Sequence, residues 1–273
     1  MIVTELNVYP LKSGGGTSLR EAEITPRGIR NDRELMLVTP DGRHLSQREI
    51  PAMALLRPVY DGRRLRVGPV DPEPPAVVAA PLVHDVRRAG PARDITLFRV
   101  PYRGVDQGDT AAGWFSAALG TPCRLVCLPD DHVRPLDPRH GGGEVGYADA
   151  FPLLVTSAES LAELNTRLPE PVPMNRFRPN IVVSGWDEPF GEDRVRRLRI
   201  GEVEIELVGP CGRCMIVNVN QGTGTRERQP LRALAGFRTV ARKILFGQGG
   251  VPRTPGKIRV GDPVVVLERV RNR

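Results

Sequence analysis

The sequence predicts a mostly β fold of the β-rich α+β class, in which many short strands are joined by tight turns. Three observations support this prediction. Glycine (29 residues) and proline (27 residues) are plentiful in a chain of 273 residues, and both favour turns over long helices. Short apolar or alternating runs recur between turn residues. Helical periodicity is confined to a few short segments, so we expect a barrel-like arrangement of strands rather than a doubly wound sheet.

The N-terminal segment predicts a strand over residues 2–9, followed by a glycine-rich turn. The turn, Pro10-Leu-Lys-Ser-Gly-Gly-Gly16, combines a cation at Lys12 and a hydroxyl at Ser13 with glycines that let the backbone approach a ligand closely. It lacks the glycine spacing and the following helix of a Walker phosphate-binding loop. From these residues alone, a ligand-binding turn and a plain flexible turn both remain open.

Hairpins dominate the rest of the first half. The turn signals Pro40-Asp41-Gly42 and Asp61-Gly62 each separate two strand-like runs. Strands are expected over 34–39, 44–47, 53–60, 65–67, 94–100 and 123–128. A helix is expected over 110–119, because Gly120 stands at the usual position of a helix stop. The proline-rich segment 69–81 is expected to be a surface loop.

Residues 129–146 are rich in proline, aspartate and glycine and show no periodicity, so we expect two domains, 1–129 and 130–273. Beyond this segment, Thr156-Ser157-Ala158-Glu159 has the pattern of a capping box. Leu161, Leu164 and Leu168 predict the apolar face of the helix that follows. Strands are expected over 151–155, 181–183, 197–200, 203–208 and 215–219, then a helix over 231–240 and a last strand pair over 257–260 and 264–267.

The charge of the chain favours an anion site or a solvated surface over nucleic-acid binding. The formal charge is +7, from 39 Lys and Arg against 32 Asp and Glu. Nearly all the cations are arginine, whose planar fork grips phosphate. A solvated arginine-rich surface explains the same composition. No recognition helix, aromatic–glycine RNA motif or dense basic run is evident, so no nucleic-acid partner is expected.

The sequence also allows a prediction of the cellular compartment. The N-terminal run lacks the charged and then apolar pattern of a secretory signal, and no stretch approaches the ~18 continuous apolar residues of a membrane span. We therefore expect a cytoplasmic protein without a membrane partner, whose four cysteines do not form a disulfide framework.

Two of these cysteines lie on a tight turn, Val208-Gly-Pro-Cys-Gly-Arg-Cys214, between two apolar strand-like runs. A zinc site shared with Cys123 and Cys127 is disfavoured, because residues four apart on a strand lie ~13 Å from each other. A thioredoxin-like pair is disfavoured, because the flanks predict strands rather than a helix N-terminus. Inert thiols stay an open alternative, although Arg213 favours the thiolate, which is the form that ligates metals.

Short motifs along nearly the whole chain together resemble one family. In order they are Tyr9-Pro-Leu-Lys-Ser13, Asn31-Asp-Arg-Glu-Leu35, Tyr147-Ala-Asp149, Leu153-Leu-Val-Thr-Ser157 with Ser160-Leu-Ala-Glu-Leu-Asn165, Asn175-Arg-Phe-Arg-Pro-Asn-Ile-Val-Val183, Cys211-Gly-Arg-Cys214 with Val219-Asn-Gln-Gly-Thr-Gly224, and Lys257-Ile-Arg-Val-Gly-Asp-Pro263. In their number and order the chain resembles the MOSC proteins (molybdenum cofactor sulfurase C-terminal domain) of the amidoxime-reducing kind. The resemblance implies an N-terminal β-barrel-like domain packed on a MOSC β-barrel with a few short helices.

The resemblance also implies a site. Cys214 would ligate molybdenum in a molybdenum cofactor (Mo-molybdopterin), a pterin dithiolene that carries a phosphate, and Cys211 would not ligate. Carried over by position, the cofactor-binding residues are Lys12, Ser13, Arg33, Ser157, Arg178, Asn180, Gly212 and Arg213. Asp149 would be a proton donor or an orienting residue. Near Gln248-Gly-Gly250 relatives place an aromatic residue against the cofactor, so this contact is expected to be lost or made by backbone, in a more open pocket.

The implied activity is the reduction of N-hydroxylated small molecules, amidoximes and hydroxylamines. Because the sequence carries no plant-type ferredoxin cysteine pattern and no haem or flavin motif, the electrons are expected from an external ferredoxin-, flavin- or haem-type protein. The alternative is a sulfur-carrier or cofactor-delivery protein that holds a persulfide on Cys214. The family also has an association with pyridoxal phosphate.

Overall fold

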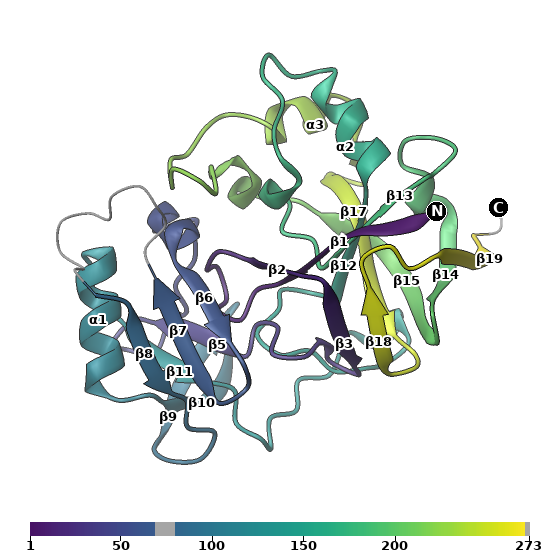
Figure 1. The fold of residues 1–273 in the computed structure, drawn as a ribbon. Helices are drawn as coiled ribbons and strands as arrows, with labels where there is room; N and C mark the ends of the chain where they lie inside the picture. The colour runs from purple at the N-terminus through teal and green to yellow at the C-terminus, as the bar shows by residue number, and fades with distance from the viewer. Residues whose placement is uncertain (69–79, 271–273) are drawn as a thin grey trace.

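The computed structural model describes residues 1–68 and 80–270, and Figure 1 shows their arrangement. Most of the expected loop at 69–81 lies outside the described residues. The mostly β class is confirmed, since strands are gathered into one large and three smaller sheets. Within the described residues no sheet closes into a barrel. No described helix is long and apolar enough to cross a membrane.

The large sheet organises the C-terminal half. Its order is β19-β14-β15-β17-β12-β13-β1-β2, and β16 pairs with β17. The bounds are β1 Ile2–Val8, β2 Thr17–Leu19, β12 Leu153–Ser157, β13 Ile181–Ser184, β14 Val195–Ile200, β15 Val203–Gly212, β16 Thr239–Val240, β17 Lys243–Pro252 and β19 Val264–Arg269. Alternating burial along β14 and the first part of β15 is typical of strands with one solvated face, whereas β12 is buried throughout.

The N-terminal half holds two smaller sheets, of order β5-β11-β10-β9 and β6-β7-β8. Their strands are β5 Leu35–Val38, β6 Arg57–Tyr60, β7 Arg64–Gly68, β8 Leu82–Asp85, β9 Ala92–Leu97, β10 Val100–Asp106 and β11 Arg124–Cys127. Helix α1 (Asp109–Leu119) buries Ala111 and Phe115 in the core of this half, and Gly120 closes it in the left-handed conformation, as predicted.

Strands from the two ends of the chain are interleaved. β1 pairs with β13, and the third small sheet joins β3 (Glu21–Thr25) and β4 (Gly28–Ile29) to β18 (Gly256–Arg259). Figure 1 shows these N-terminal strands beside the C-terminal ones rather than with the rest of the first half. The division into 1–129 and 130–273 stays a prediction, and the pairing shows that the first strands belong physically to the second half.

Several expected elements differ from the structure. The segment expected as a strand over 215–219 is a 3-10 helix, η5 (Met215–Asn218), because β15 stops pairing with β17 at Gly212 and the chain then turns to bury Val217 in the core. Residues 44–47 form only a single bridge, Val38 with His44, and Pro51–Leu55 is a 3-10 helix (η1). The strands expected as a last pair, β18 and β19, lie in different sheets.

The predicted helices are present but shorter. α2 spans Ala158–Asn165 and is capped by Ser157, whose Oγ accepts a hydrogen bond from the Ser160 N–H (3.1 Å). The predicted capping box begins at Thr156, whereas the observed N-cap is Ser157, one residue later. Leu164 is fully buried, whereas Leu168 lies past the helix end. α3 spans Leu231–Phe237 and is followed by β16.

Glu192 is a fully buried carboxyl group in the 3-10 helix η4 (Gly191–Arg194). Its two oxygens accept hydrogen bonds from Ser160 Oγ (2.9 Å each), and burial raises its pKa to about 7. Because the folded protein binds this proton more tightly than the unfolded chain, stability is lost as pH rises from about 4.5 to about 7.

We expect Glu192→Gln to remove this loss. Relative to the variant, the wild type should lose about 3 kcal/mol of unfolding free energy between pH 5 and pH 8, measured by denaturant unfolding at each pH. The difference in unfolding free energy between the two proteins isolates the titration of Glu192 from that of other groups. If this difference in free energy did not change with pH, the prediction would be contradicted.

Candidate functional site

A cavity with a volume of about 180 Å³ lies where the two halves meet. Every site residue predicted from the sequence lines it except Ser157. The lining is Lys12, Ser13, Arg33, Ala148, Asp149, Ala150, Phe151, Leu153, Leu154, Phe177, Arg178, Asn180, Cys211, Gly212, Arg213, Cys214, Ile216 and Val217. Segments from both halves therefore contribute to one concave surface, as expected of a ligand site.

The thiol turn sits at one wall of the cavity. β15 carries it out of the sheet, and the Arg213 N–H donates to the Ile244 carbonyl (2.7 Å), which fixes the turn to β17. Cys214 is exposed, whereas Cys211 is half-buried. The Arg213 guanidinium lies 3.0 Å from Cys211 Sγ and donates to the Phe177 carbonyl (2.8 Å). The arginine expected to favour a thiolate thus contacts the first thiol, and Cys214 is left free toward the cavity.

The glycine-rich turn is part of the cavity floor. Lys12 and Ser13 are 4% and 8% exposed, and the Lys12 N–H donates to the Leu35 carbonyl (2.8 Å). A Cβ on Gly15 would lie 2.0 Å from Arg57 Nη1, so this glycine makes room for an arginine packed against it. The burial and packing decide against the alternative of a plain flexible turn.

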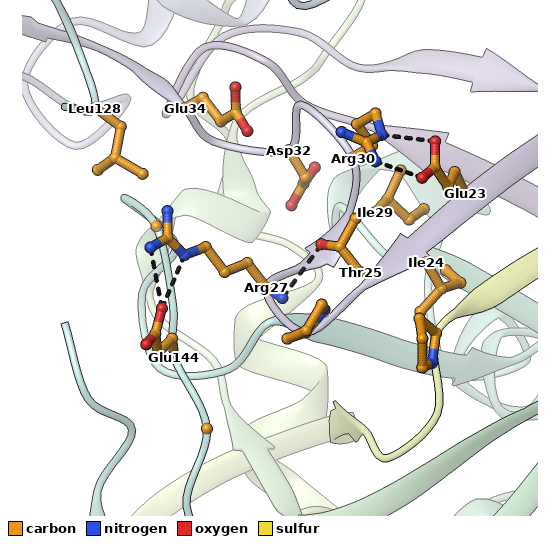
Figure 2. Close-up of a pocket in the computed structure, with 14 residues that line it drawn as sticks. Glu23, Ile24, Thr25, Arg27, Ile29, Arg30, Asp32, Glu34, Leu128 and Glu144 are labelled. Atoms are coloured by element: carbon orange, nitrogen blue, oxygen red, sulfur yellow. Dashed lines mark hydrogen bonds and ion pairs between the residues drawn. The ribbon is translucent and has the colours of Figure 1, made fainter. Parts of the chain in front are cut away.

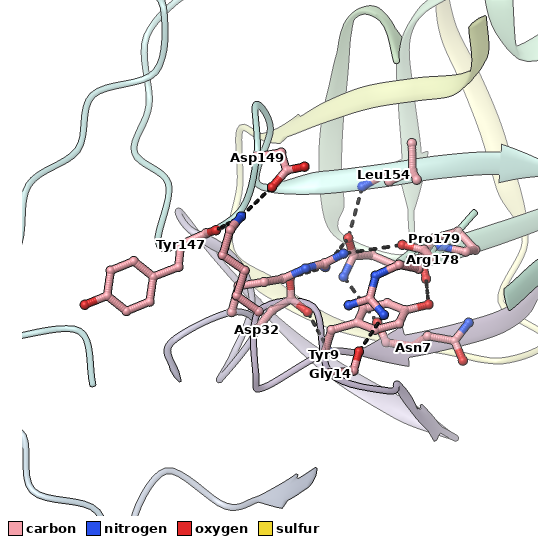
Figure 3. A network of polar contacts seen from close by, with 12 residues as sticks. Asn7, Tyr9, Gly14, Asp32, Tyr147, Asp149, Leu154, Arg178 and Pro179 are labelled. Atoms are coloured by element: carbon pink, nitrogen blue, oxygen red, sulfur yellow. Dashed lines mark hydrogen bonds and ion pairs between the residues drawn. The ribbon is translucent and has the colours of Figure 1, made fainter. Parts of the chain in front are cut away.

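The Lys12 ammonium forms an ion pair with Asp149 and donates to the Tyr147 carbonyl (2.8 Å), as Figure 3 shows. Burial lowers the pKa of Lys12, while Asp149 opposes that shift. The Asp149 side chain keeps 60% of its surface exposed. Desolvation raises its pKa, but Lys12 outweighs this effect and holds the pKa below its ordinary value. Asp149 is therefore an anion at neutral pH.

Two arginines that line the cavity, Arg33 and Arg178, converge on the ring of Tyr9. The guanidinium carbons of Arg33 and Arg178 lie 4.3 and 4.4 Å from the centroid of the Tyr9 ring. Burial, followed by the charge of Arg33, lowers the pKa of Arg178 to about 10. Asp32 pairs with Arg33 and its Oδ1 accepts from the Tyr9 N–H (2.8 Å). The single carboxylate of Asp32 beside the two guanidinium groups leaves net positive charge for an anionic ligand.

Asn180 ties this cluster to the sheet. Its Oδ1 accepts from Arg33 Nη1 (3.2 Å) and from the Leu154 N–H (3.1 Å), and its Nδ2 donates to the Asn7 carbonyl (3.2 Å). The same side chain therefore holds Arg33 of the first half against strand β12 of the second.

Tyr9 was not predicted as a site residue, and its substitution should lower the free energy of unfolding. We expect Tyr9→Leu to lower the free energy of unfolding by about 2–3 kcal/mol, because two buried cations lose the ring between them. Tyr9→Phe keeps the ring and loses only the hydrogen bond that Tyr9 Oη donates to the Pro179 carbonyl (3.1 Å), so it should cost about 1 kcal/mol. Denaturant unfolding measures both. Equal losses would assign the effect to the hydroxyl instead.

A buried glutamine pair that was not predicted from the sequence joins the glycine-rich turn to the loop after η5. Gln221, in the loop after η5, donates to Gln47 Oε1 (3.0 Å). Gln47 in turn donates to the Ser13 carbonyl (2.9 Å). The pair thus connects the loop after η5 to the glycine-rich turn, a contact that no local sequence pattern signals.

Ser157 lies away from the cavity lining. It is fully buried, and its hydroxyl donates to Glu159 Oε2 (2.9 Å) while it caps α2. The structure therefore gives this residue a helix-capping function, and its role toward a cofactor stays a prediction without geometric support.

The other two thiols are far from this chemistry. Cys123 and Cys127 are buried among the apolar side chains of the N-terminal core, and burial raises both pKa values. In residues 1–68 and 80–270 no group of three or more His, Cys, Asp or Glu side chains could hold a metal ion. A zinc site shared by the four cysteines is therefore excluded for this fold.

A second pocket, shown in Figure 2, lies near β3 and β4. Its carboxylates already have arginine partners: Glu144 accepts from Arg27 (3.0 Å), and Glu23 pairs with Arg30. Because these charges are satisfied within the protein, the pocket presents no unpaired cation or carboxylate pair for a ligand.

Two protein families together match most of the chain. The MOSC domain family matches residues 142–265, and the MOSC N-terminal beta barrel domain family matches residues 1–122. Mitochondrial amidoxime-reducing component 1 of Homo sapiens is 34% identical over 289 residues, which cover 97% of this chain and 82% of that protein. Mitochondrial amidoxime reducing component 2 of Homo sapiens is 32% identical over 285 residues, covering 96% and 82%. Molybdenum cofactor sulfurase of Oryza sativa subsp. japonica is 32% identical over 262 residues, covering 88% of this chain and 31% of that protein.

Proposed function

The chain belongs to the MOSC family, and from this premise we propose that it is a molybdenum cofactor-dependent oxidoreductase that reduces N-hydroxylated small molecules. One observation carries the proposal. An exposed thiol, Cys214, stands in a cavity whose charged lining consists of Lys12, Arg33, Arg178, Arg213 and a single carboxylate among the described lining residues, Asp149.

The residues fit a thiolate-ligated metal with a phosphate-bearing organic ligand. A cysteine thiolate is a soft ligand, and arginines suit phosphate because they donate in a planar fork. Arg213 Nε is buried without a hydrogen-bond partner, which leaves a donor for an additional group. Lys12, Ser13, Arg33, Arg178, Asn180, Gly212 and Arg213 would hold the cofactor, and Cys214 would ligate its molybdenum. When bound, the cofactor supplies the redox chemistry, the exchange of electrons with the N–O bond.

The reaction converts an amidoxime or hydroxylamine to the amidine or amine and water, and it consumes two electrons and two protons. The electrons come from an external electron-transfer protein of the ferredoxin, flavin or haem type. Because Lys12 keeps Asp149 ionised, Asp149 serves as an orienting residue for the ammonium rather than as the proton donor. The Lys12 ammonium, held by Asp149 and the Tyr147 carbonyl, would contribute positive charge to the cavity wall.

The second candidate function is sulfur carriage or cofactor delivery, with a persulfide on Cys214. The exposure of this thiol in an open cavity favours access by a sulfur donor as well. For either function we propose a cytoplasmic location, because free thiols persist in a reducing compartment.

Elemental and pterin analysis of the purified protein separates the two functions. Stoichiometric molybdenum with pterin, followed by reduction of benzamidoxime with a chemical electron donor, supports the reductase. Labile sulfane sulfur without molybdenum supports the carrier and contradicts the first proposal.

A further inference from the structure

Phe151 forms an aromatic part of the cavity wall. It is half-buried and lies two residues after Asp149. Arg134 fixes the segment that carries both residues, because its guanidinium donates to the carbonyls of Ala148 (2.6 Å) and Asp149 (2.8 Å). The ring is therefore presented to the cavity on a restrained segment, next to the Lys12–Asp149 pair.

Gly249 of β17 lies directly beneath this ring. A Cβ on Gly249 would fall 2.2, 2.3 and 2.5 Å from Phe151 Cδ2, Cγ and Cε2. Three nearly equal distances mean that the face of the ring, rather than its edge, lies against the strand. Gly249 is not in the left-handed region of backbone conformation, so what requires glycine here is room for the ring.

The expected consequence of glycine at this position, a more open pocket, is therefore wrong for this side of the cavity. The space that a side chain on β17 would take is filled by Phe151 from the segment before β12. His140 holds the ring further, with ring centroids 5.0 Å apart at an interplanar angle of 69°, and its Nδ1 lies 3.3 Å from the Val208 carbonyl. The aromatic surface is thus fixed in orientation before any ligand binds.

A fixed aromatic surface favours flat conjugated ligands, because offset stacking and edge contacts add to the gain from buried area. Small aliphatic ligands lack such a surface. We propose that Phe151, seated on Gly249, is a specificity-determining residue that selects N-hydroxylated substrates with a planar aromatic group; this inference rests on the proposed function.

Binding measured without any electron donor tests the inference independently of turnover. The probes are benzamidoxime and acetamidoxime, titrated by calorimetry into the purified wild type and the Phe151→Leu variant. Leucine keeps an apolar side chain against the neighbouring core residues Leu136 and Val251. We expect Kd for benzamidoxime to rise about tenfold and Kd for acetamidoxime to change less than about twofold. Equal changes for the two probes would overturn the inference.

Phe237→Leu is the matched control, because Phe237 is a partly buried aromatic residue of α3 outside the cavity lining. This variant should bind both probes as the wild type does. A loss of benzamidoxime binding in this control as large as in Phe151→Leu would show that aromatic loss anywhere in the protein produces the effect.

Gly249→Ala provides a second, independent arm. The added methyl group would displace the ring, so this variant should reproduce the selective loss of benzamidoxime binding. In the Phe151→Leu background the same substitution should change Kd less than about twofold, since the rigid ring is gone. An equal effect in both backgrounds would show that Gly249 acts through the backbone and would count against the inference.

Two further outcomes separate this inference from the proposed function. If Phe151→Leu loses molybdenum together with affinity for both probes, the ring supports the cofactor or the fold, and the inference fails. If the wild type binds benzamidoxime through Phe151 but does not reduce it while loaded with molybdenum, the proposed reaction fails and the aromatic specificity stands.

Discussion

Replacing Cys214 with serine is expected to lower the molybdenum content at least tenfold and amidoxime reduction at least a hundredfold. The thiol is exposed to the cavity and makes no hydrogen bond that the fold depends on, so the variant should remain folded. A serine hydroxyl is a hard, weakly acidic donor and does not replace a soft thiolate. Metal analysis and a benzamidoxime assay on the same preparation measure both losses.

Cys211→Ser is the matched control for this experiment. Both thiols line the same cavity, but Cys211 lies against Arg213 at 3.0 Å, which commits its sulfur to a contact within the protein. We expect this variant to keep at least half of its molybdenum. Full retention of metal and activity by Cys214→Ser would contradict the assignment of the metal ligand, and equal loss in both variants would mean that both thiols ligate.

Asp149→Asn is expected to reduce amidoxime reduction by about 10- to 100-fold and to lower the free energy of unfolding by about 2 kcal/mol. Asparagine keeps the shape of the side chain but removes the negative charge, which leaves the buried Lys12 ammonium with the Tyr147 carbonyl as its remaining partner. The estimate for stability is below that for a fully buried pair because the carboxylate is 60% exposed.

The opposite substitution, Lys12→Met, should cost less stability. It removes the buried charge and leaves a carboxylate that solvent can reach, so we expect a loss of about 1 kcal/mol. Denaturant unfolding of the two variants tests this asymmetry. Because the pKa of Asp149 is held low, Asp149→Asn should also remove no limb of the pH–rate profile between pH 5 and 8. A limb that disappears in that range would restore Asp149 as the proton donor.

Local patterns predicted the elements whose structure depends on nearby residues. Gly120 ends α1 because a left-handed residue needs no neighbours from elsewhere in the chain. The cap of α2 and the turn after β6 follow from short-range chemistry in the same way. Residues 215–219 have the composition of a strand, but the β15–β17 ladder ends at Gly212, and the chain then forms a 3-10 helix that buries Val217.

The site was predicted mainly by the family resemblance, and the parts that were missed depend on contacts between distant residues. Tyr9 lies between arginines at positions 33 and 178, and Gln47 pairs with Gln221; no spacing in the sequence shows either pair. The sequence shows glycine at position 249, but it does not show that Phe151, from the segment before β12, fills the space beside this glycine.

Because β1 pairs within the C-terminal sheet, the chain cannot be divided between its two halves without breaking strand pairs. A fragment starting at residue 130 would expose the edge of β13 where β1 pairs, and it would leave β18 without β3. Unpaired edges of this kind recruit other chains. We therefore expect that the regions matched by the two families do not fold separately, and that the polypeptide unfolds in a single cooperative transition to which both ends contribute.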